Sequence, residues 1–241
     1  MKKRLDVVLF EKGLVESRSK AQALVMAGTV SVNGKKITKA GTQIDEDDLI
    51  EIEKQNPYVS RGGLKLESVL NLFEIDFTDK VCIDIGASTG GFTDCMLQHG
   101  AKKVYAVDVG TAQLHYKLRN DKRVVNIENV NFRYFDKSLL KDDIDIITID
   151  VSFISLDKIL PLASQIIKEQ GMIVAMIKPQ FELEPNEVKK GVVRDESLRQ
   201  KAINKIKDCA VGLDLKILKE QDSGLKGPKG NLEHFILLGK K

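Results

Sequence analysis

The chain has 241 residues, enough for one large domain or for a small domain beside a medium one. Hydrophobic residues make up 42% of the chain and charged residues 30%, with 5 Pro and 18 Gly, a balance that excludes disordered, collagenous and fibrous proteins. The 38 Lys and Arg exceed the 35 Asp and Glu by only three, so the chain is not a general polycation. Any nucleic-acid site must therefore come from a local concentration of charge.

The sequence predicts neither a membrane span nor an export signal. The apolar stretch 171–177 and the uncharged run 21–34 fall well short of the roughly 20 residues that cross a bilayer. The basic start of the chain is followed at once by acidic residues and lacks the apolar core of a signal peptide. The three cysteines contain no CxxC pair, so we expect a cytoplasmic protein with buried thiols and without disulfides or a metal site.

Charge is segregated along the N-terminal third. Residues 1–41 contain nine Lys and Arg against three Asp and Glu, a net charge of +6, whereas residues 42–57 contain one Lys against six acids, a net charge of −5. In the basic part, apolar residues at helical spacing predict two short helices, and Ser17 is placed to cap the second. Alternating apolar residues around Asn33 and Gly34, a strong hairpin signal, predict a small curled sheet after these helices.

Residues 3–52 resemble the S4 RNA-binding domain, in the run RLDVVLFEKGLVESRSKAQALVMAGTVSVNGKKI. In that family, the second helix and the strand after it form a basic face that binds structured RNA. The resemblance implies RNA contacts at Arg4, Arg18, Ser19, Lys20, Lys35 and Lys36. Grouped basic residues would neutralise several phosphates together, and double-stranded RNA is read mainly by its shape and backbone. For any single one of these residues, ordinary solvated charge is the alternative.

Pro57 marks a domain boundary, because proline disfavours helix in the residue before it and turn chemistry follows. We predict an S4-like RNA-binding domain at 1–57, a linker at 58–63 and a second domain at 64–241. The second domain alternates helical patterns with short β-branched runs, which predicts an α/β fold with a mostly parallel sheet covered by helices on both faces. The predicted strands are residues 81–85, 103–107, 124–127, 144–149, 171–177, 213–218 and 235–238.

A glycine-rich loop follows the first strand of this domain. It reads DIGASTGGFT from Asp84 onward and opens a helix, and Asp108 ends the next strand, 22 positions after Gly86. Glycines permit close backbone approach to a ligand, and the later carboxylate accepts hydrogen bonds from ribose hydroxyls. The G-x-x-x-G-G spacing differs from the G-x-G-x-x-G of dinucleotide sites, and Asp84 would repel a pyrophosphate. Asp84 instead suits a ligand that carries an ammonium or sulfonium cation.

This loop is similar to the S-adenosylmethionine loop of Rossmann-like methyltransferases. The likeness implies that Asp84 lies near the methionine end, that Asp108 holds the ribose and that residues 128–131 flank the adenine. The implied cofactor-binding residues are Asp84, Gly86, Ala87, Ser88, Gly90, Gly91, Phe92, Asp108, Val130 and Asn131. The chain departs from the pattern at Ala112, where we expect a glycine.

Two charged residues close apolar strands at the edge of the sheet where ligands bind. Asp150 and Lys178 end adjacent predicted strands, and such residues cost desolvation unless they are paired, so we expect them to be partners. Pairing alone would be a structural explanation. Two further charged residues favour a functional site over a purely structural ion pair. They are Lys65, on the helix after the boundary, and Glu233, at the start of the last strand.

Lys65, Asp150, Lys178 and Glu233 match the Lys-Asp-Lys-Glu tetrad of FtsJ-like RNA ribose 2′-O-methyltransferases. The whole chain, with YVSRGGLKL, DIGASTGGFTD, DVSFIS and KPQFE, resembles the TlyA family, also called hemolysin A. The resemblance implies a Rossmann-like class I methyltransferase domain with a mostly parallel seven-stranded sheet beside a small α+β S4 domain. It also implies S-adenosyl-L-methionine as cofactor and the 2′-hydroxyl of cytidine in ribosomal RNA as substrate. The expected partner is ribosomal RNA or a ribosomal subunit, and neither DNA nor a membrane.

The reaction would be an in-line displacement in which a ribose hydroxyl attacks the sulfonium methyl, so the protein must orient two substrates and manage one proton. Lys178 is the expected general base. Lys65 would favour its neutral form and the two carboxylates its charged form, so stabilisation of the developing alkoxide by a charged Lys178 stays open. The glycine-rich loop 222–231 precedes Glu233 and is either a flexible hairpin or a segment that closes over RNA.

Two other classes of function compete with this hypothesis. A non-catalytic RNA-binding or ribosome-assembly factor would use the second domain only as a scaffold, and the presence of all four tetrad residue types argues against it. A membrane-lytic protein would need a spanning segment or a strongly amphipathic basic helix, and the sequence predicts neither.

Overall fold

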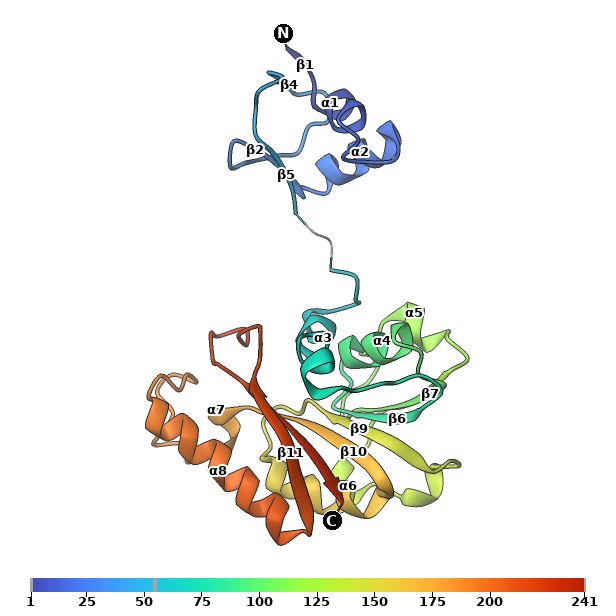
Figure 1. The fold of residues 1–241 in the computed structure, drawn as a ribbon, viewed down its shortest axis with the longest axis vertical. Coiled ribbons are helices and arrows are strands. Elements are labelled where there is room, and N and C mark those ends of the chain that lie inside the picture. Colours follow the sequence, from blue (N-terminus) through green and yellow to red (C-terminus); the bar gives the residue numbers. More distant parts are fainter. Residues whose placement is uncertain (1, 54–55, 241) are drawn as a thin grey trace. The chain divides into compact units, whose positions relative to one another are not determined.

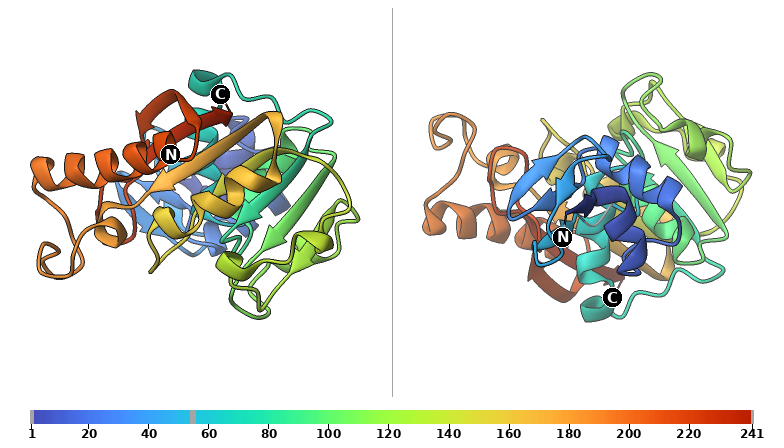
Figure 2. Two further views of the ribbon diagram at one scale, coloured as in Figure 1. Left: turned by 90° about the horizontal axis from the view of Figure 1, so that it is seen from below. Right: turned by 90° about the horizontal axis from the view of Figure 1, so that it is seen from above.

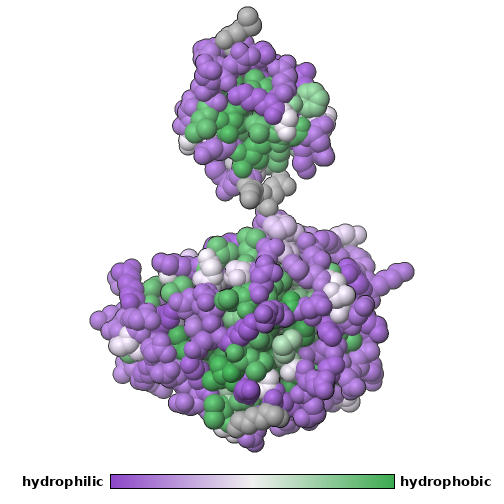
Figure 3. Space-filling model, in the orientation of Figure 1, coloured by the Kyte–Doolittle hydropathy of each residue, from purple (hydrophilic) through white to green (hydrophobic). Residues whose placement is uncertain are grey.

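The computed structural model describes residues 2–53 and 56–240, so residues 1, 54–55 and 241 of the two predicted domains lie outside the described residues. The chain divides into two compact units, 1–57 and 58–241 (Figure 1). Hydrophilic side chains make up most of the visible surface of each unit in Figure 3. Within the part of the chain that the structure describes, no helix combines the length and the apolarity that a membrane crossing requires.

The first unit consists of two short helices beside small strands. Ser17 caps the second helix by accepting a hydrogen bond from the backbone N–H of Lys20 at 3.2 Å, as predicted. The predicted hairpin is also present, because Asn33 and Gly34 have φ values of 51° and 75° and join two antiparallel strands. The elements are β1 (Lys3–Arg4), α1 (Leu5–Glu11), α2 (Arg18–Met26), β2 (Val30–Val32), β3 (Lys35–Ile37), β4 (Gln43–Ile44) and β5 (Ile50–Ile52).

A buried carboxylate, that of Asp6, joins α1 to α2. Its side chain is fully buried and accepts hydrogen bonds from Arg4 Nε at 3.0 Å, Arg18 Nε at 3.1 Å and Gln22 Nε2 at 2.8 Å. The Arg4 contact is the largest of the causes that hold the pKa of Asp6 well below its usual value, and burial opposes it. Arg4 and Arg18, which the S4 resemblance implies as RNA contacts, therefore also hold the first unit together.

Asp6→Asn should destabilise the first unit by about 1.5–3 kcal/mol at neutral pH, because hydrogen bonds between ionised groups are lost. The pKa of Asp6 is lower in the folded than in the unfolded chain, so this stabilisation is present above about pH 4 and is lost as the pH falls. Hydrogen exchange at the amides of α1 and α2 measures the effect. Equal protection of variant and wild type at pH 7 would contradict the prediction.

The second unit contains a seven-stranded sheet in the order β11-β12-β10-β9-β6-β7-β8 (Figure 1). Strand β12 runs antiparallel to β10 and β11, and the other neighbouring strands are parallel. This topology confirms the predicted sheet. The strands are β6 (Val81–Ile85), β7 (Lys103–Val107), β8 (Val124–Ile127), β9 (Ile144–Ile149), β10 (Ile167–Ile177), β11 (Leu215–Asp222) and β12 (His234–Lys240).

Helices cover both faces of this sheet, and alternate strand residues face opposite helical layers. On β6, Cys82 packs in the cluster with α3 and α4, whereas Ile83 packs in the cluster with α6 and α8, as a side-chain period of two requires. Figure 2 shows α6 and α8 on the same face. The helices are α3 (Arg61–Phe73), α4 (Gly91–Gln98), α5 (Tyr116–Arg119), α6 (Leu160–Ile166), α7 (Pro179–Glu182) and α8 (Glu196–Gly212).

Several boundaries differ from the predictions, and β10 and β12 extend beyond the predicted 171–177 and 235–238. Residues 58–63 are not a linker, because Tyr58 is buried in the second unit and α3 begins at Arg61. A Cβ added at Gly63 would lie 2.2 Å from the ring of Tyr58, so this glycine serves a close contact rather than a flexible turn. The strand predicted at 213–218 begins at Leu215 and continues to Asp222, because pairing with β12 supports its polar end.

Candidate active site

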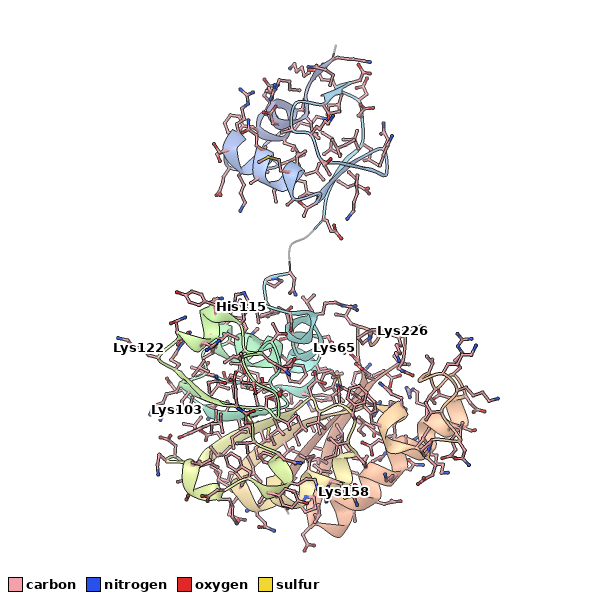
Figure 4. All side chains as sticks on the ribbon, turned by 180° about the vertical axis from the view of Figure 1, so that it is seen from behind. Lys65, Lys103, His115, Lys122, Lys158 and Lys226 are labelled. Carbon is pink, nitrogen blue, oxygen red and sulfur yellow. The ribbon has the colours of Figure 1, made fainter. Side chains whose placement is uncertain are left out.

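The four tetrad side chains meet at the carboxyl edge of the sheet. Lys65 comes from α3 and is labelled in Figure 4, Asp150 and Lys178 follow β9 and β10, and Glu233 precedes β12. Lys65 Nζ lies 2.5 Å from Glu233 Oε2, and Lys178 Nζ lies 2.6 Å from Asp150 Oδ1. All four residues line one cavity of about 480 Å³. Each lysine is thus compensated by one carboxylate inside the same space.

Little water reaches three of these side chains, since Lys65 is 7% exposed, Lys178 8% and Glu233 1%. Burial raises the pKa of Asp150 above its usual value, although the positive charges of Lys178 and Lys65 act in the opposite direction. Lys178 Nζ also donates a hydrogen bond to Ser152 Oγ at 2.9 Å. Sequence analysis did not single out Ser152, whose only signal was its place in DVSFIS.

Two further cavities adjoin the tetrad, and Asp150 and Ser152 border all three. The larger, of about 600 Å³, contains the predicted cofactor residues Gly86, Ser88, Asp108, Val130 and Asn131. The smaller, of about 250 Å³, contains Asp84, Gly86, Ala87, Ser88, Gly91 and Phe92. The structure therefore places nine of the ten predicted cofactor residues along two cavities that meet beside the tetrad.

Two glycines of the loop serve different contacts. Gly86 has a φ of 83°, and a Cβ there would lie 2.9 Å from the main-chain oxygen of Asp150, so this position lets β6 approach the end of β9. Gly90, with a φ of 96°, faces Leu114 and Leu118 instead of the cavities, and a Cβ there would lie 2.3 Å from Leu118. Gly90 thus turns the chain into α4.

Backbone groups fix the two carboxylates that the cofactor motif contributes. Asp108 accepts hydrogen bonds from the N–H groups of Ser88 at 2.8 Å and Gly110 at 2.7 Å, which joins the loops after β6 and β7. Asp84 is 1% exposed and accepts from the N–H of Thr93 at 2.9 Å and from its hydroxyl at 2.6 Å. Burial raises the pKa of Asp84 to about 7, and the hydrogen bonds from Thr93 oppose this shift.

The region beyond β8 borders the larger cavity. The N–H of Val130 donates to the main-chain oxygen of Asp108 at 3.1 Å, and Asn131 Oδ1 accepts from the N–H of Arg133 at 3.1 Å. Ala112 has a φ of 54°, in the left-handed region that favours glycine. This conformation agrees with the expectation of a glycine at that position.

Glu182 is a buried carboxylate that sequence analysis did not assign to the site. It accepts hydrogen bonds from the N–H of Leu156 at 2.9 Å and from the hydroxyl of Ser155, and Lys205 of α8 donates to Ser155 Oγ at 3.0 Å. These contacts join the loop after β9, which carries Asp150, to α7 after β10. The sequence signal was the position of Glu182 in KPQFE.

The family model of the FtsJ-like methyltransferase matches residues 58–240, and that of the S4 domain matches residues 3–50. Hemolysin A of Brachyspira hyodysenteriae is 49% identical over 97% of this chain and 100% of its own. The 16S/23S rRNA (cytidine-2′-O)-methyltransferase TlyA of Mycobacterium tuberculosis is 37% identical over 98% of this chain and 89% of its own. A solved Streptococcus thermophilus protein, described as a hemolysin, has a TM-score of 0.77 at 43% identity and covers 100% of this chain and 89% of its own.

Fold and site together define a Rossmann-like methyltransferase domain that follows an S4 domain. Magnesium protoporphyrin IX methyltransferase (ChlM) from Synechocystis shares this fold, with a TM-score of 0.53 at 10% identity. The chain belongs to the FtsJ-like methyltransferase family, in the group whose members carry the names TlyA and hemolysin A. The predicted fold class and family resemblance are thereby confirmed.

Asp84→Asn should stabilise the protein more strongly at pH 8 than at pH 5. The pKa of Asp84 is about 7 in the folded protein and near 4 in the unfolded chain, so its ionisation costs folding free energy that grows as the pH rises from about 4 to 7. Thermal unfolding of the ligand-free protein checks this. A difference in Tm between variant and wild type that stays constant from pH 5 to pH 8 would contradict it.

Proposed function

We propose that this protein is an S-adenosyl-L-methionine-dependent methyltransferase of the 2′-hydroxyl of cytidine in ribosomal RNA, and that it acts in the cytoplasm. The observation that carries the proposal is the meeting of Lys65, Asp150, Lys178 and Glu233 in one cavity beside the predicted cofactor residues. The name of the Mycobacterium tuberculosis relative states methyl transfer to the 2′-oxygen of cytidine in rRNA for that protein. A non-catalytic assembly factor would not require two lysine–carboxylate pairs to share a cavity.

The residues beside the tetrad fit S-adenosyl-L-methionine. Asp108 borders the larger cavity with a carboxylate suited to ribose hydroxyls, and Val130 and Asn131 border the same cavity where an adenine would lie. Asp84 borders the smaller cavity, and its buried carboxyl suits the cationic methionyl end. Gly86 borders both cavities, and a Cβ at this position would lie too close to the main chain at the end of β9. When bound, the cofactor supplies a methyl group on a sulfonium centre.

Lys178 is the residue that would either accept the proton of the attacking hydroxyl or stabilise the negative charge that develops on its oxygen. Its Nζ is held from one side by Asp150 and Ser152, both in the loop after β9, so its direction is fixed before a substrate enters. The carboxylate contact supports the role in which the ammonium group of Lys178 stabilises the developing alkoxide, while the proton of the hydroxyl is lost to water. Lys65 and Glu233, joined across the same cavity, would orient the ribose.

The first unit would bind ribosomal RNA, in a ribosomal subunit or as free RNA, through its basic side chains. Lys20 and Lys35 are exposed, Lys36 is exposed and pairs with Glu53 at 3.1 Å, and the side chain of Arg18 stays 51% exposed beside Asp6. Relatives that match a part of this chain include small ribosomal subunit protein uS4 of Dichelobacter nodosus, at 29% identity over 38% of this chain and 43% of its own.

Lys178→Ala should abolish methyl transfer while leaving cofactor affinity intact, because Lys178 acts at the hydroxyl and not at the adenosine. We expect a loss of about 10²–10⁴ in rate. A 2′-O-methyl group protects the neighbouring phosphodiester from alkali, so the wild type should leave one gap in a hydrolysis ladder of treated rRNA. Lys216→Ala, an exposed lysine of β11, is the matched control. A methylated product that stays alkali-labile would show that a base is the target.

Replacing both Lys20 and Lys35 by Ala should weaken RNA binding and flatten its dependence on salt. Each phosphate contact contributes about one unit to the slope of log affinity against log salt, so the slope should fall by about one to two. Filter binding at several salt concentrations measures this. Lys216→Ala serves again as the control, and an unchanged slope in the double variant would mean that the first unit is not the electrostatic anchor.

A further inference from the structure

The smaller cavity contains charged side chains that neither the tetrad nor the cofactor motif includes. Arg61, the first residue of α3, and Lys226, in the loop between β11 and β12, both border it. Arg61 Nη2 donates to the main-chain oxygen of Lys226 at 3.2 Å, which brings two positive residues together. Both residues are exposed, and among residues 2–53 and 56–240 no ion pair involves either side chain. Two uncompensated cations at one cavity favour an anionic ligand.

The loop that carries Lys226 is joined to the rest of the second unit by hydrogen bonds of its backbone and of Asn231. The N–H of Gly227 donates to the main-chain oxygen of Asn231 at 2.9 Å. The side chain of Asn231 is buried, donates to the main-chain oxygen of Gly191 at 2.9 Å and accepts from the N–H of Val193 at 2.9 Å. Figure 4 labels Lys226 on this loop and Lys65 on α3. The backbone at Lys226 is therefore held beside Arg61.

The charges of the smaller cavity are complementary to those of an amino acid. Arg61 and Lys226 supply positive charge, and Asp84 supplies a buried carboxyl in the same space. Asp150 and Lys178 also border this cavity and compensate each other. An α-amino acid carries one carboxylate and one ammonium group, whereas a phosphodiester carries only negative charge and would leave Asp84 without a cationic partner. The volume of about 250 Å³ lies below the range of about 300–1,000 Å³ that drug-sized ligands occupy. A short zwitterionic chain fits this space better than a nucleotide.

We propose that Arg61 and Lys226 form an oxyanion subsite that binds the α-carboxylate of the methionyl group of the cofactor. This inference rests on the proposed function, because it takes S-adenosyl-L-methionine as the cofactor. The planar guanidinium of Arg61 suits a carboxylate, and Lys226 adds a second positive charge from the opposite segment. A Cβ at Gly227 would lie 2.6 Å from Glu233 Oε1, so the same loop contacts the tetrad.

The test compares two ligands that differ only in this carboxylate: S-adenosylhomocysteine and its decarboxylated analogue. Calorimetry with the full-length wild type should give a preference of roughly tenfold to hundredfold for S-adenosylhomocysteine, the range of a hydrogen bond to a charged group. In Arg61→Met, which keeps the length of the side chain, this preference should fall toward one while affinity for the analogue is little changed. Lys226→Met should lower the preference in the same direction.

Lys229→Met is the matched control, because Lys229 lies on the same loop but borders the tetrad cavity. This variant should keep the wild-type preference. Equal loss of affinity for both ligands in Arg61→Met, or an unchanged preference with weaker binding of rRNA, would overturn the carboxylate subsite, and the second result would assign the pair to an RNA phosphate. A wild type that binds neither ligand would overturn the proposed cofactor itself.

Discussion

Charge compensation inside one poorly hydrated cavity is the constraint on which this site depends. Two lysines and two carboxylates share the cavity, and each lysine lies within 2.6 Å of a carboxylate oxygen. Removing one partner of such a buried pair typically costs about 3–5 kcal/mol, because the remaining charge stays in the protein without a counterion. The four residues come from α3, from the ends of β9 and β10 and from the start of β12, so the charges to which we assign the chemistry also join four distant segments.

Close backbone contacts set the positions at which these charges meet. Gly86 lets β6 approach the end of β9, Gly63 lets α3 approach the ring of Tyr58, and a Cβ at Gly91 would lie 2.3 Å from Ser60 Oγ. These contacts bring the first turns of α3 and α4 together beside the cavities. A larger side chain at any of them would move a segment that carries a site residue, and a displacement of about 1 Å is enough to cost a large part of the rate.

The sequence predicts those elements for which a residue pattern is compatible with only one local structure. The predicted limits of β6 to β9 agree with the structure, and the apolar runs at β6, β7 and β9 are largely buried on both faces, whereas β8 is half-buried. The linker prediction was wrong because glycine serves both turns and close contacts, and Gly63 serves the second. Arg4 shows a similar ambiguity, since a basic side chain can contact a phosphate or a buried carboxylate such as Asp6. The contact between Arg61 and Lys226 joins segments far apart in sequence, where no local pattern predicts it.

The surroundings of Asp6 and Asp84 differ in a way that matches the structural role of the first and the binding role that we propose for the second. Both are at most 1% exposed, yet the pKa of Asp6 is held well below its usual value and that of Asp84 is raised to about 7. Asp6 accepts hydrogen bonds from two guanidinium groups, which compensate its charge fully within the fold. Asp84 accepts from Thr93 and Thr148, which are neutral donors, and no ion pair of the described residues involves it. The proposed contact with the ammonium group of a methionyl chain would supply the cationic partner that the fold does not provide.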